Sequence, residues 1–158
     1  MKKILLSVIL LAAGITLRAQ TLTVNGLVNK PLQLTAADLS KMPQQTITAA
    51  DKDGKTHQYS GVPLFEILKA AGVPSGKELH GNNLAKYLLA QASDGYKVVF
   101  ALPEIDTTFN NRVFLLTTLM DGKPLPAGQG PYRLVVKDEK RPARWIRELT
   151  TLTIGEIK

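Results

Sequence analysis

The stretch HQYSGVPLFEILKAAG, residues 57–72, passes from an extended segment into a helix. Pro63 suits the first helical position, because the N–H that proline lacks has no partner within the helix there. Apolar residues then recur at helical spacing on one face: Leu64, Ile67, Leu68 and Ala71. Gly72 follows, and glycine commonly ends a helix. We therefore predict a helix from Pro63 to Ala71 that packs one face against a core.

Strands are predicted on both sides of this helix. A hairpin is expected from Gln44–Ala50 and Lys55–Ser60, around the turn at residues 51–54, and a second from Leu84–Ala92 and Lys97–Leu102, around residues 93–96. Further strands are predicted at Thr21–Val28, Val113–Met120, Tyr132–Lys137 and Thr150–Ile154. Strands dominate and no regular strand–helix–strand rhythm occurs. The predicted class is α+β, with a mixed or antiparallel β-sheet and short helices.

One further short helix is predicted from local signals alone. Thr35 and Asp38 have the spacing of a capping box, in which each side chain bonds the other residue's backbone N–H. Leu34 and Leu39 stand at the positions of a hydrophobic staple, and Pro43 ends the helix.

The first residues have the order of a secretory signal peptide. Lys2 and Lys3 precede an almost wholly apolar run, Ile4–Leu17, and Ala19 supplies a small residue at the end. The run is short for a membrane span, although an uncleaved anchor is the alternative. We expect a signal peptide at residues 1–19, a single domain at 20–158, and export to the periplasm or the medium. No membrane insertion is expected after cleavage.

Charge and cysteine content exclude several function classes. The formal net charge is +7, but Lys2, Lys3 and Arg18 lie in the predicted signal peptide, which leaves 17 basic against 13 acidic residues, a net of +4. That balance is too mild to indicate a nucleic-acid partner. The sequence contains no cysteine, so thiolate metal sites, thiol nucleophiles and disulfides are excluded.

Several segments, in order, resemble the oxidoreductase molybdopterin-binding domain, the fold of sulfite oxidases and related bacterial periplasmic oxidoreductases. They span roughly residues 22 to 155. The matching segments are Tyr59–Leu64, Ala70–Gly72, Asp94–Tyr96, Leu102–Glu104, Leu115–Pro126, Gly130–Val136 and Arg144–Ile146. The resemblance implies a sulfite-oxidase-like fold and makes molybdopterin the cofactor to consider.

The sequence departs from this family at places that face the cofactor. In the family, a cysteine thiolate from the strand and turn before the Gly-Val-Pro-Leu segment binds molybdenum, whereas residues 46–51 here are TITAAD. Molybdenum in such enzymes takes a soft sulfur ligand, which alanine cannot supply. The enzymes often carry a histidine where this chain has Gln129, and a glycine-bearing loop where it has residues 137–142, KDEKRP. We therefore expect no cofactor.

Basic residues are crowded between positions 133 and 147, and guanidinium groups there can form an anion pocket. Because the resemblance puts them near the pterin, the candidate ligand-binding residues are Arg133, Arg144, Trp145 and Gln129. A solvated loop is the simpler interpretation for Lys137, Lys140 and Arg141, since charge runs usually face solvent. A lone tryptophan such as Trp145 is more often partly buried core than a ligand platform.

No catalytic or metal-binding role is predicted for the remaining polar candidates. His57 and His80 make a poor metal set without cysteine or spaced carboxylates. Glu104 and Asp106 do not share a helix face. Asp94 and Tyr96 are explained by turn chemistry.

Three hypotheses about function follow. The first is a non-catalytic exported binding or accessory domain that holds a small anionic or pterin-like ligand or docks on a redox protein. The second is an active molybdopterin-dependent oxidoreductase with a non-cysteine metal ligand, for which Asp51 is the oxygen donor to test. The third is a protein-interaction module with no small ligand.

Overall fold

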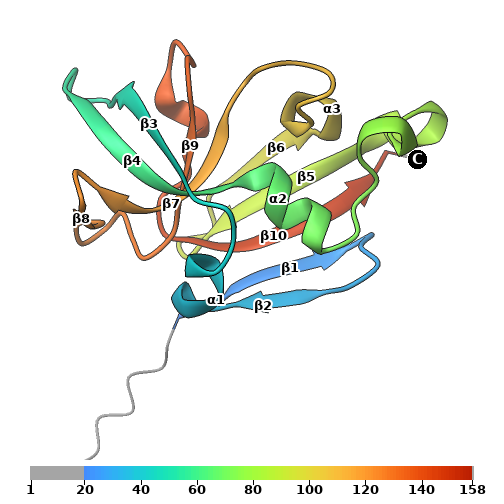
Figure 1. The fold of residues 1–158 in the computed structure, drawn as a ribbon, viewed down its shortest axis with the longest axis horizontal. Helices are drawn as coiled ribbons and strands as arrows, with labels where there is room; N and C mark the ends of the chain where they lie inside the picture. The colour runs from blue at the N-terminus through green and yellow to red at the C-terminus, as the bar shows by residue number, and fades with distance from the viewer. Residues whose placement is uncertain (1–19, 158) are drawn as a thin grey trace, which may run out of the picture.

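The computed structural model describes residues 20–157 and contains two β-sheets. Figure 1 shows β3, β4, β7, β8 and β9 on the left, the strands of the second sheet on the right, and α2 in front. The predicted signal peptide, residues 1–19, lies outside the described residues. The arrangement confirms the predicted α+β class.

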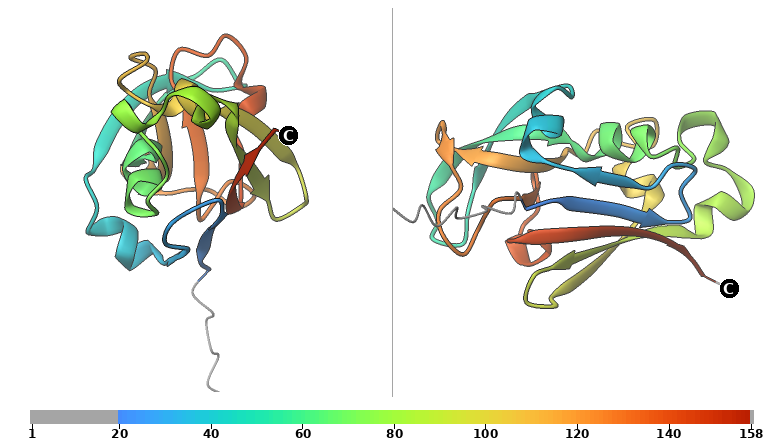
Figure 2. Two further views of the ribbon diagram at one scale, coloured as in Figure 1. Left: turned by 90° about the vertical axis from the view of Figure 1, so that its right-hand side faces the viewer. Right: turned by 90° about the horizontal axis from the view of Figure 1, so that it is seen from below.

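One sheet joins the two ends of the described chain. Its strand order is β2–β1–β10–β5–β6. The strands are β1 (Leu22–Gly26), β2 (Leu32–Leu34), β5 (Lys86–Ala92), β6 (Lys97–Ala101) and β10 (Leu149–Glu156). β1 and β10 lie side by side and run parallel, with Thr23 opposite Thr151, whereas the other pairs are antiparallel (Figure 2). The sheet is therefore mixed, as predicted.

The other sheet is antiparallel and carries most of the candidate site. Its order is β3–β4–β7–β8, with β9 also paired to β7. The strands are β3 (Gln45–Ala50), β4 (Thr56–Pro63), β7 (Phe114–Met120), β8 (Lys123–Pro124) and β9 (Arg133–Val136). Gly61 in β4 admits the backbone of β7, since a Cβ there would lie 2.0 Å from the carbonyl oxygen of Leu116.

The helices are short and lie in the connections between successive strands. The α-helices are α1 (Ala36–Ser40), α2 (Leu64–Ala70) and α3 (Leu102–Ile105), and the 3₁₀ turns are η1 (Gly76–Glu78), η2 (Gly81–Ala85) and η3 (Pro142–Arg144). The capping box of α1 is formed as predicted: the Thr35 hydroxyl accepts from the Asp38 amide at 3.2 Å, and the Asp38 carboxylate accepts from the Thr35 amide at 3.0 Å.

Two boundary predictions are corrected. Pro63 is not the first residue of α2 but its N-cap, because β4 continues through Pro63 opposite Leu115 before the chain turns into the helix. The second hairpin begins at Lys86 rather than Leu84, because residues 81–85 form a 3₁₀ turn. The predicted apolar face of α2 is confirmed, since Leu64, Ile67 and Leu68 are buried.

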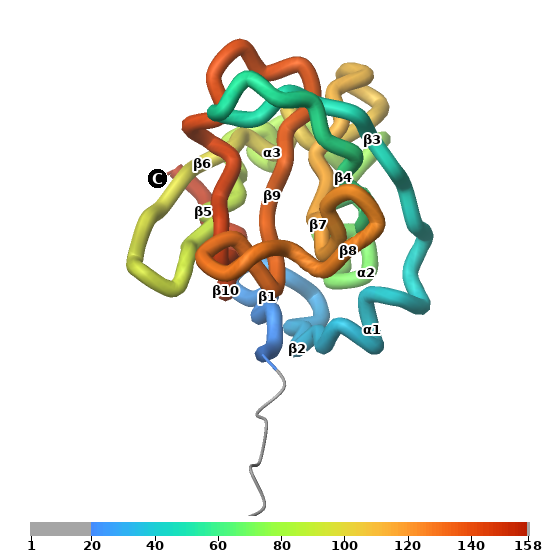
Figure 3. Tube along the Cα trace, turned by 90° about the vertical axis from the view of Figure 1, so that its left-hand side faces the viewer, coloured from blue at the N-terminus to red at the C-terminus, as the bar shows by residue number. Residues whose placement is uncertain are grey.

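A single hydrophobic cluster runs through both sheets in the described residues. Above it, the turn between β3 and β4 and the loop after β9 lie at the same end of the molecule (Figures 1 and 3). This loop folds back along β9: the amide of Leu134 donates to Ile146 at 2.8 Å, and that of Leu149 donates to Tyr132 at 2.9 Å. The fold thereby places residues 51 and 145 on either side of β9.

Candidate functional site

Arg133 stands at the centre of a polar cluster inside the fold. It is the first residue of β9 and is fully buried. Its guanidinium donates two hydrogen bonds to the Asp51 carboxylate, at 2.9 Å and 3.0 Å. It also donates to the side-chain oxygen of Gln129 and, at 3.4 Å, to the hydroxyl of Tyr59. The cluster is therefore held by a bidentate ion pair, the strongest arrangement available to these two side chains.

Local structure explains why Asp51 faces Arg133. Asp51 follows the last residue of β3, and its amide donates to the Lys55 carbonyl at 2.9 Å, which closes the turn into β4. Tyr59 on β4 is fully buried and donates its hydroxyl to Asp51 at 3.0 Å. β7 lies between β4 and β9, so the ion pair joins the β3–β4 turn to a strand that is not paired with β3 or β4.

Aromatic rings enclose the guanidinium of Arg133. Its central carbon lies 5.3 Å from the ring centroid of Tyr59 and 5.5 Å from that of Trp145, within the range of cation–π attraction. The two rings meet edge to face, with centroids 5.8 Å apart. Trp145 is 5% exposed and donates its indole N–H to the Val136 carbonyl at 3.0 Å. It belongs to the core, as the simpler interpretation of the sequence predicts.

The cluster shifts the acidity of both groups that share it with Arg133. Burial by itself raises the pKa of Asp51, but hydrogen bonds from Arg133 and from the Lys52 amide, with the charge of Arg133, outweigh burial and hold that pKa well below its ordinary value. Burial also raises the pKa of Tyr59 to about 12, against a lowering by Arg133. At neutral pH the cluster thus contains a carboxylate, a guanidinium and a neutral phenol.

Arg144, the other predicted anion-binding arginine, lies in a different cluster. It donates two hydrogen bonds to Glu139 and one, at 3.2 Å, to Glu104, and its guanidinium covers the ring of Phe100 at 4.8 Å. Burial lowers the pKa of Arg144, but the hydrogen bonds that Arg144 donates to Glu139 and Glu104, with the charges of those carboxylates, outweigh burial, so the net shift of that pKa is upward. The structure thus brings Gln129, Arg133 and Trp145 together and leaves Arg144 apart.

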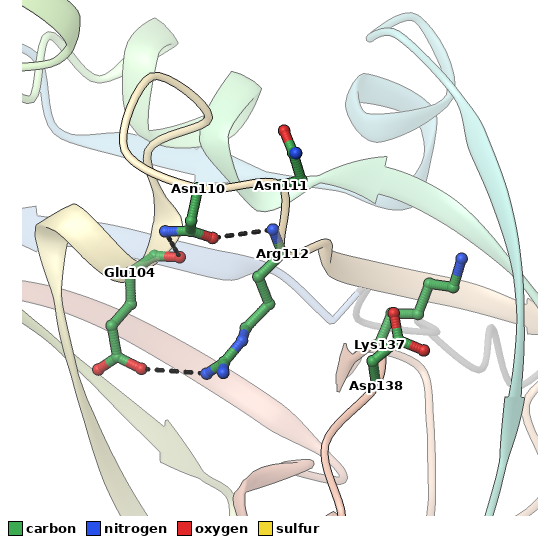
Figure 4. A pocket seen from close by; sticks show the side chains of 6 residues that line it. All are labelled: Glu104, Asn110, Asn111, Arg112, Lys137 and Asp138. Carbon is green, nitrogen blue, oxygen red and sulfur yellow. Dashed lines mark hydrogen bonds and ion pairs between the residues drawn. The ribbon is translucent and has the colours of Figure 1, made fainter.

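A wide polar cavity of about 580 Å³ adjoins the Arg144 cluster. Figure 4 shows Glu104 and Arg112 pointing toward each other on one side, at 3.5 Å, with Lys137 and Asp138 on the other. Lys140 and Arg141 are exposed, as predicted for a solvated loop, whereas Lys137 is half-buried.

The two histidines take no part in the hydrogen bonds of the Arg133 cluster, although the ring of His57 meets that of Tyr59 edge to face, with centroids 6.2 Å apart. His57 pairs through Nδ1 with Asp121 at 2.6 Å and has Asp53 at 3.9 Å, and His80 is exposed in a loop. Within residues 20–157, no group of three or more His, Cys, Asp or Glu side chains could hold a metal ion. Over the same residues, no helix has the length and apolar character needed to span a membrane.

The donor set does not fit molybdenum. The sequence offers no cysteine sulfur. Asp51, the oxygen donor to be tested, already accepts four hydrogen bonds: two from Arg133, one from Tyr59 and one from the Lys52 amide at 2.7 Å. A carboxylate has about four lone-pair positions. Every position is therefore in use, and a metal could bind Asp51 only by displacing Arg133, Tyr59 or the Lys52 amide.

The sequence does not reveal the roles of three residues in this cluster. It offers Asp51 as a metal ligand and not as the partner of Arg133, and it contains Tyr59 only within a segment that resembles the family. Arg147, which lies 3.9 Å from Asp51, is one of several basic residues in the sequence, with no role predicted for it. Only the alternation of β4 could have identified Tyr59 as an inward-facing residue, and no local pattern connects residue 51 with residue 133.

Comparison with known proteins supports the resemblance seen in the sequence. Residues 12–156 match the family described as the oxidoreductase molybdopterin binding domain. The structure is similar to the crystal structure of the sulfane dehydrogenase SoxCD from Paracoccus pantotrophus, with a TM-score of 0.69 and 24% identity, over 87% of this chain and 38% of that one. At that identity the likeness shows the fold alone, and this chain spans well under half of that protein.

A search of curated proteins found no match. The family match covers nearly all of the chain, and the conclusion about family rests on it. The chain belongs to the oxidoreductase molybdopterin binding domain family.

Proposed function

We propose that this protein is an exported, non-catalytic binding or accessory domain of the molybdopterin-dependent oxidoreductase family. The observation that carries the proposal is the bidentate Asp51–Arg133 pair. The pair engages both oxygens of Asp51, the carboxylate that the sequence offers as a metal ligand, and both terminal nitrogens of Arg133, the arginine that the resemblance puts near the pterin. The domain keeps the scaffold while these two groups bind each other, and only the Nε of Arg133 is left without a hydrogen-bond partner in the described part of the cluster.

The second arginine supports the same proposal. Arg144 is engaged by two carboxylates, Glu139 and Glu104, so its charge is already neutralised. An anionic group that approached Arg144 would have to compete with both, and would meet their repulsion as well. Neither arginine is available as it stands to hold a phosphate or pterin. We assign the cofactor neither to Arg133 nor to Arg144.

The proposal extends to partner and location. The similar structure is that of a dehydrogenase, and the match with this chain covers only 38% of it. We propose that the domain acts beside a redox protein, binding either that protein or a small ligand. Export is proposed from the basic and apolar pattern of residues 1–19.

The test is the metal and pterin content of protein purified from its own host grown with molybdate. We expect no molybdenum and no pterin. We also expect an intact mass that corresponds to a chain beginning near Gln20. A molybdenum enzyme purified from the same cells serves as the control, since it shows that cofactor supply was adequate. One molybdenum atom per chain, together with turnover of an oxygen-atom acceptor, would overturn the proposal in favour of an active oxidoreductase.

A further inference from the structure

A second cavity lies beside Trp145 and has a different character from the one in Figure 4. Its volume is about 320 Å³. It is formed where the β3–β4 turn, the β5–β6 turn and the loop after β9 meet. Its polar and aromatic lining consists of Lys52, Asp94, Tyr96, Trp145, Arg147 and Glu148. The cavity is next to the Asp51–Arg133 pair, because Arg147 contacts Asp51 and Trp145 covers Arg133.

Tyr96 gives this cavity a fixed aromatic wall. Tyr96 is 50% exposed, yet hydrogen bonds hold both its backbone amide and its hydroxyl in place. The amide of Tyr96 donates to Asp94 Oδ1 at 2.9 Å, and its hydroxyl donates to the Ala143 carbonyl at 2.9 Å, which connects two segments 47 residues apart. Since the ring is already ordered, a ligand that contacts it loses little additional side-chain entropy. Exposed but immobilised aromatic rings are typical of binding sites.

Arg147 gives the cavity a guanidinium with donors to spare. Within the described residues its ion-pair contact is Asp51 Oδ1 at 3.9 Å, beyond hydrogen-bond distance. That oxygen already accepts from Arg133 and from the Lys52 amide, so it has little capacity for a third donor. The Arg147 side chain is 38% exposed. It differs from Arg133, which is fully buried and paired with Asp51, and from Arg144, which is paired with Glu139 and Glu104.

The other charged groups of the lining set the class of ligand. Lys52 adds a second positive charge at the rim. Asp94 is engaged in its own turn through the Tyr96 amide, while Glu148 supplies a second negative charge. A guanidinium can bind a carboxylate through two parallel hydrogen bonds, and the ring of Tyr96 can contact an aromatic ligand by its edge or its face. The volume admits one ring and its substituents.

We propose that this cavity binds a small aromatic carboxylate, with Arg147 holding the carboxylate and Tyr96 contacting the ring. The proposal deepens the proposed function, because it names the ligand class of a binding domain. It moves the ligand away from Arg133, Gln129 and Arg144 to a neighbouring surface. Trp145 contributes one wall of the cavity. Its indole N–H signal can also report ligand binding, since Trp145 is the single tryptophan of the sequence.

The experiment titrates the whole mature protein with benzoate and follows the one indole N–H signal in ¹H–¹⁵N spectra. We expect a saturable shift of that signal, with a Kd of about 1 mM, as befits a ligand of this size. Benzamide, which has the same shape without the charge, should bind at least about tenfold more weakly. No saturable shift with benzoate, or equal affinity for benzamide, would overturn the proposal.

Variants assign the roles of the two residues. Arg147→Ala should weaken benzoate binding by about tenfold or more. Arg147→Lys should have an intermediate affinity for benzoate, because lysine keeps the charge but lacks the planar guanidinium that forms two parallel hydrogen bonds. Arg141→Ala, which removes an exposed arginine outside the lining, is the matched control and should bind as the unaltered protein does. Tyr96→Phe should bind more weakly, because the ring loses its hydrogen bond to Ala143. Unchanged binding by a folded Arg147→Ala variant contradicts the proposal.

The two proposals fail separately. Molybdenum in the native protein overturns the non-catalytic function whatever benzoate does. Absence of benzoate binding in metal-free protein overturns the ligand class and leaves the proposed non-catalytic function unchanged.

Discussion

Asp51 and Arg133 are 82 residues apart in the chain, yet they form two parallel hydrogen bonds of 2.9 Å and 3.0 Å in the interior. The side chain of Arg133 is fully buried, and that of Asp51 is 7% exposed. Removing two such charges from water costs several kcal/mol for each ion, and only close geometry with further hydrogen bonds offsets the loss. Tyr59 and Gln129 provide those bonds.

The first prediction concerns loss of one partner of this pair. Asp51→Asn keeps the shape but removes the charge, so Arg133 is left as a buried cation without a counter-ion. We expect a loss of about 3–5 kcal/mol in the free energy of unfolding, measured by urea denaturation. A loss below about 1 kcal/mol, as for an exposed pair, would show that Arg133 reaches water.

Replacing both partners is the control for that prediction. The double variant Asp51→Leu with Arg133→Met leaves no unpaired charge. We expect its stability to lie within about 2 kcal/mol of the unaltered protein, since apolar replacements of buried ion pairs are often neutral or stabilising. A double variant as unstable as Asp51→Asn would instead show that the pair itself stabilises the fold.

The second prediction concerns acid. The pKa of Asp51 is lower in the folded protein than in the unfolded chain, so the unfolded chain binds more protons between the two values and stability falls as pH decreases. The contribution is complete above the ordinary aspartate pKa of about 4 and is lost as pH falls below it. The unaltered protein should therefore lose stability relative to the double variant as the pH falls below about 4, as followed by circular dichroism. A difference that stays constant there would contradict the depressed pKa.

Local signals in the sequence predict local structure here. The capping box at Thr35 and Asp38 and the helix after Pro63 depend on residues within one or two turns, and both are present. The one error at Pro63 has a tertiary cause, since pairing with Leu115 on β7 keeps Pro63 in a strand.

The candidate site could be predicted only in part. The resemblance directed attention to Gln129, Arg133 and Trp145, which do meet in space. The partner of Arg133 could not be found, because the DKDG turn that holds Asp51 explains that residue fully by turn chemistry. No periodicity relates residue 51 to residue 133, and only the register of β4, β7 and β9 brings them together.

The third prediction concerns alkaline pH. Burial raises the pKa of Tyr59 to about 12, from an ordinary value of 10.0, so the folded protein keeps a proton that the unfolded chain releases. Stability should be unaffected below about pH 10 and should fall as pH rises toward about 12. Tyr59→Phe removes this dependence at a loss of about 1 kcal/mol at neutral pH, from the missing bond to Asp51. The slope should become shallower but not vanish, because burial also raises the pKa of Tyr132.

Urea unfolding at alkaline pH compares the two proteins directly. An identical pH slope in Tyr59→Phe and in the unaltered protein would mean that Tyr59 titrates as if exposed. The analogous variant Tyr87→Phe changes a half-buried tyrosine on β5 and controls for the substitution itself.

The fourth prediction separates the two arginines that the sequence treats alike. Arg133→Met leaves the Asp51 carboxylate buried and unpaired, so we expect a loss of about 3–5 kcal/mol. Arg144 is 31% exposed, and its partner Glu104 is 34% exposed and also pairs with Arg112, although Glu139 is 13% exposed. Arg144→Met, which keeps an apolar side chain over Phe100, should therefore lose only about 1 kcal/mol. Urea denaturation of both variants under the same conditions measures the contrast. Equal losses in the free energy of unfolding would mean that the two arginines contribute alike to stability. That result would contradict the inference that the Asp51–Arg133 pair has replaced ligand binding at the centre of the domain.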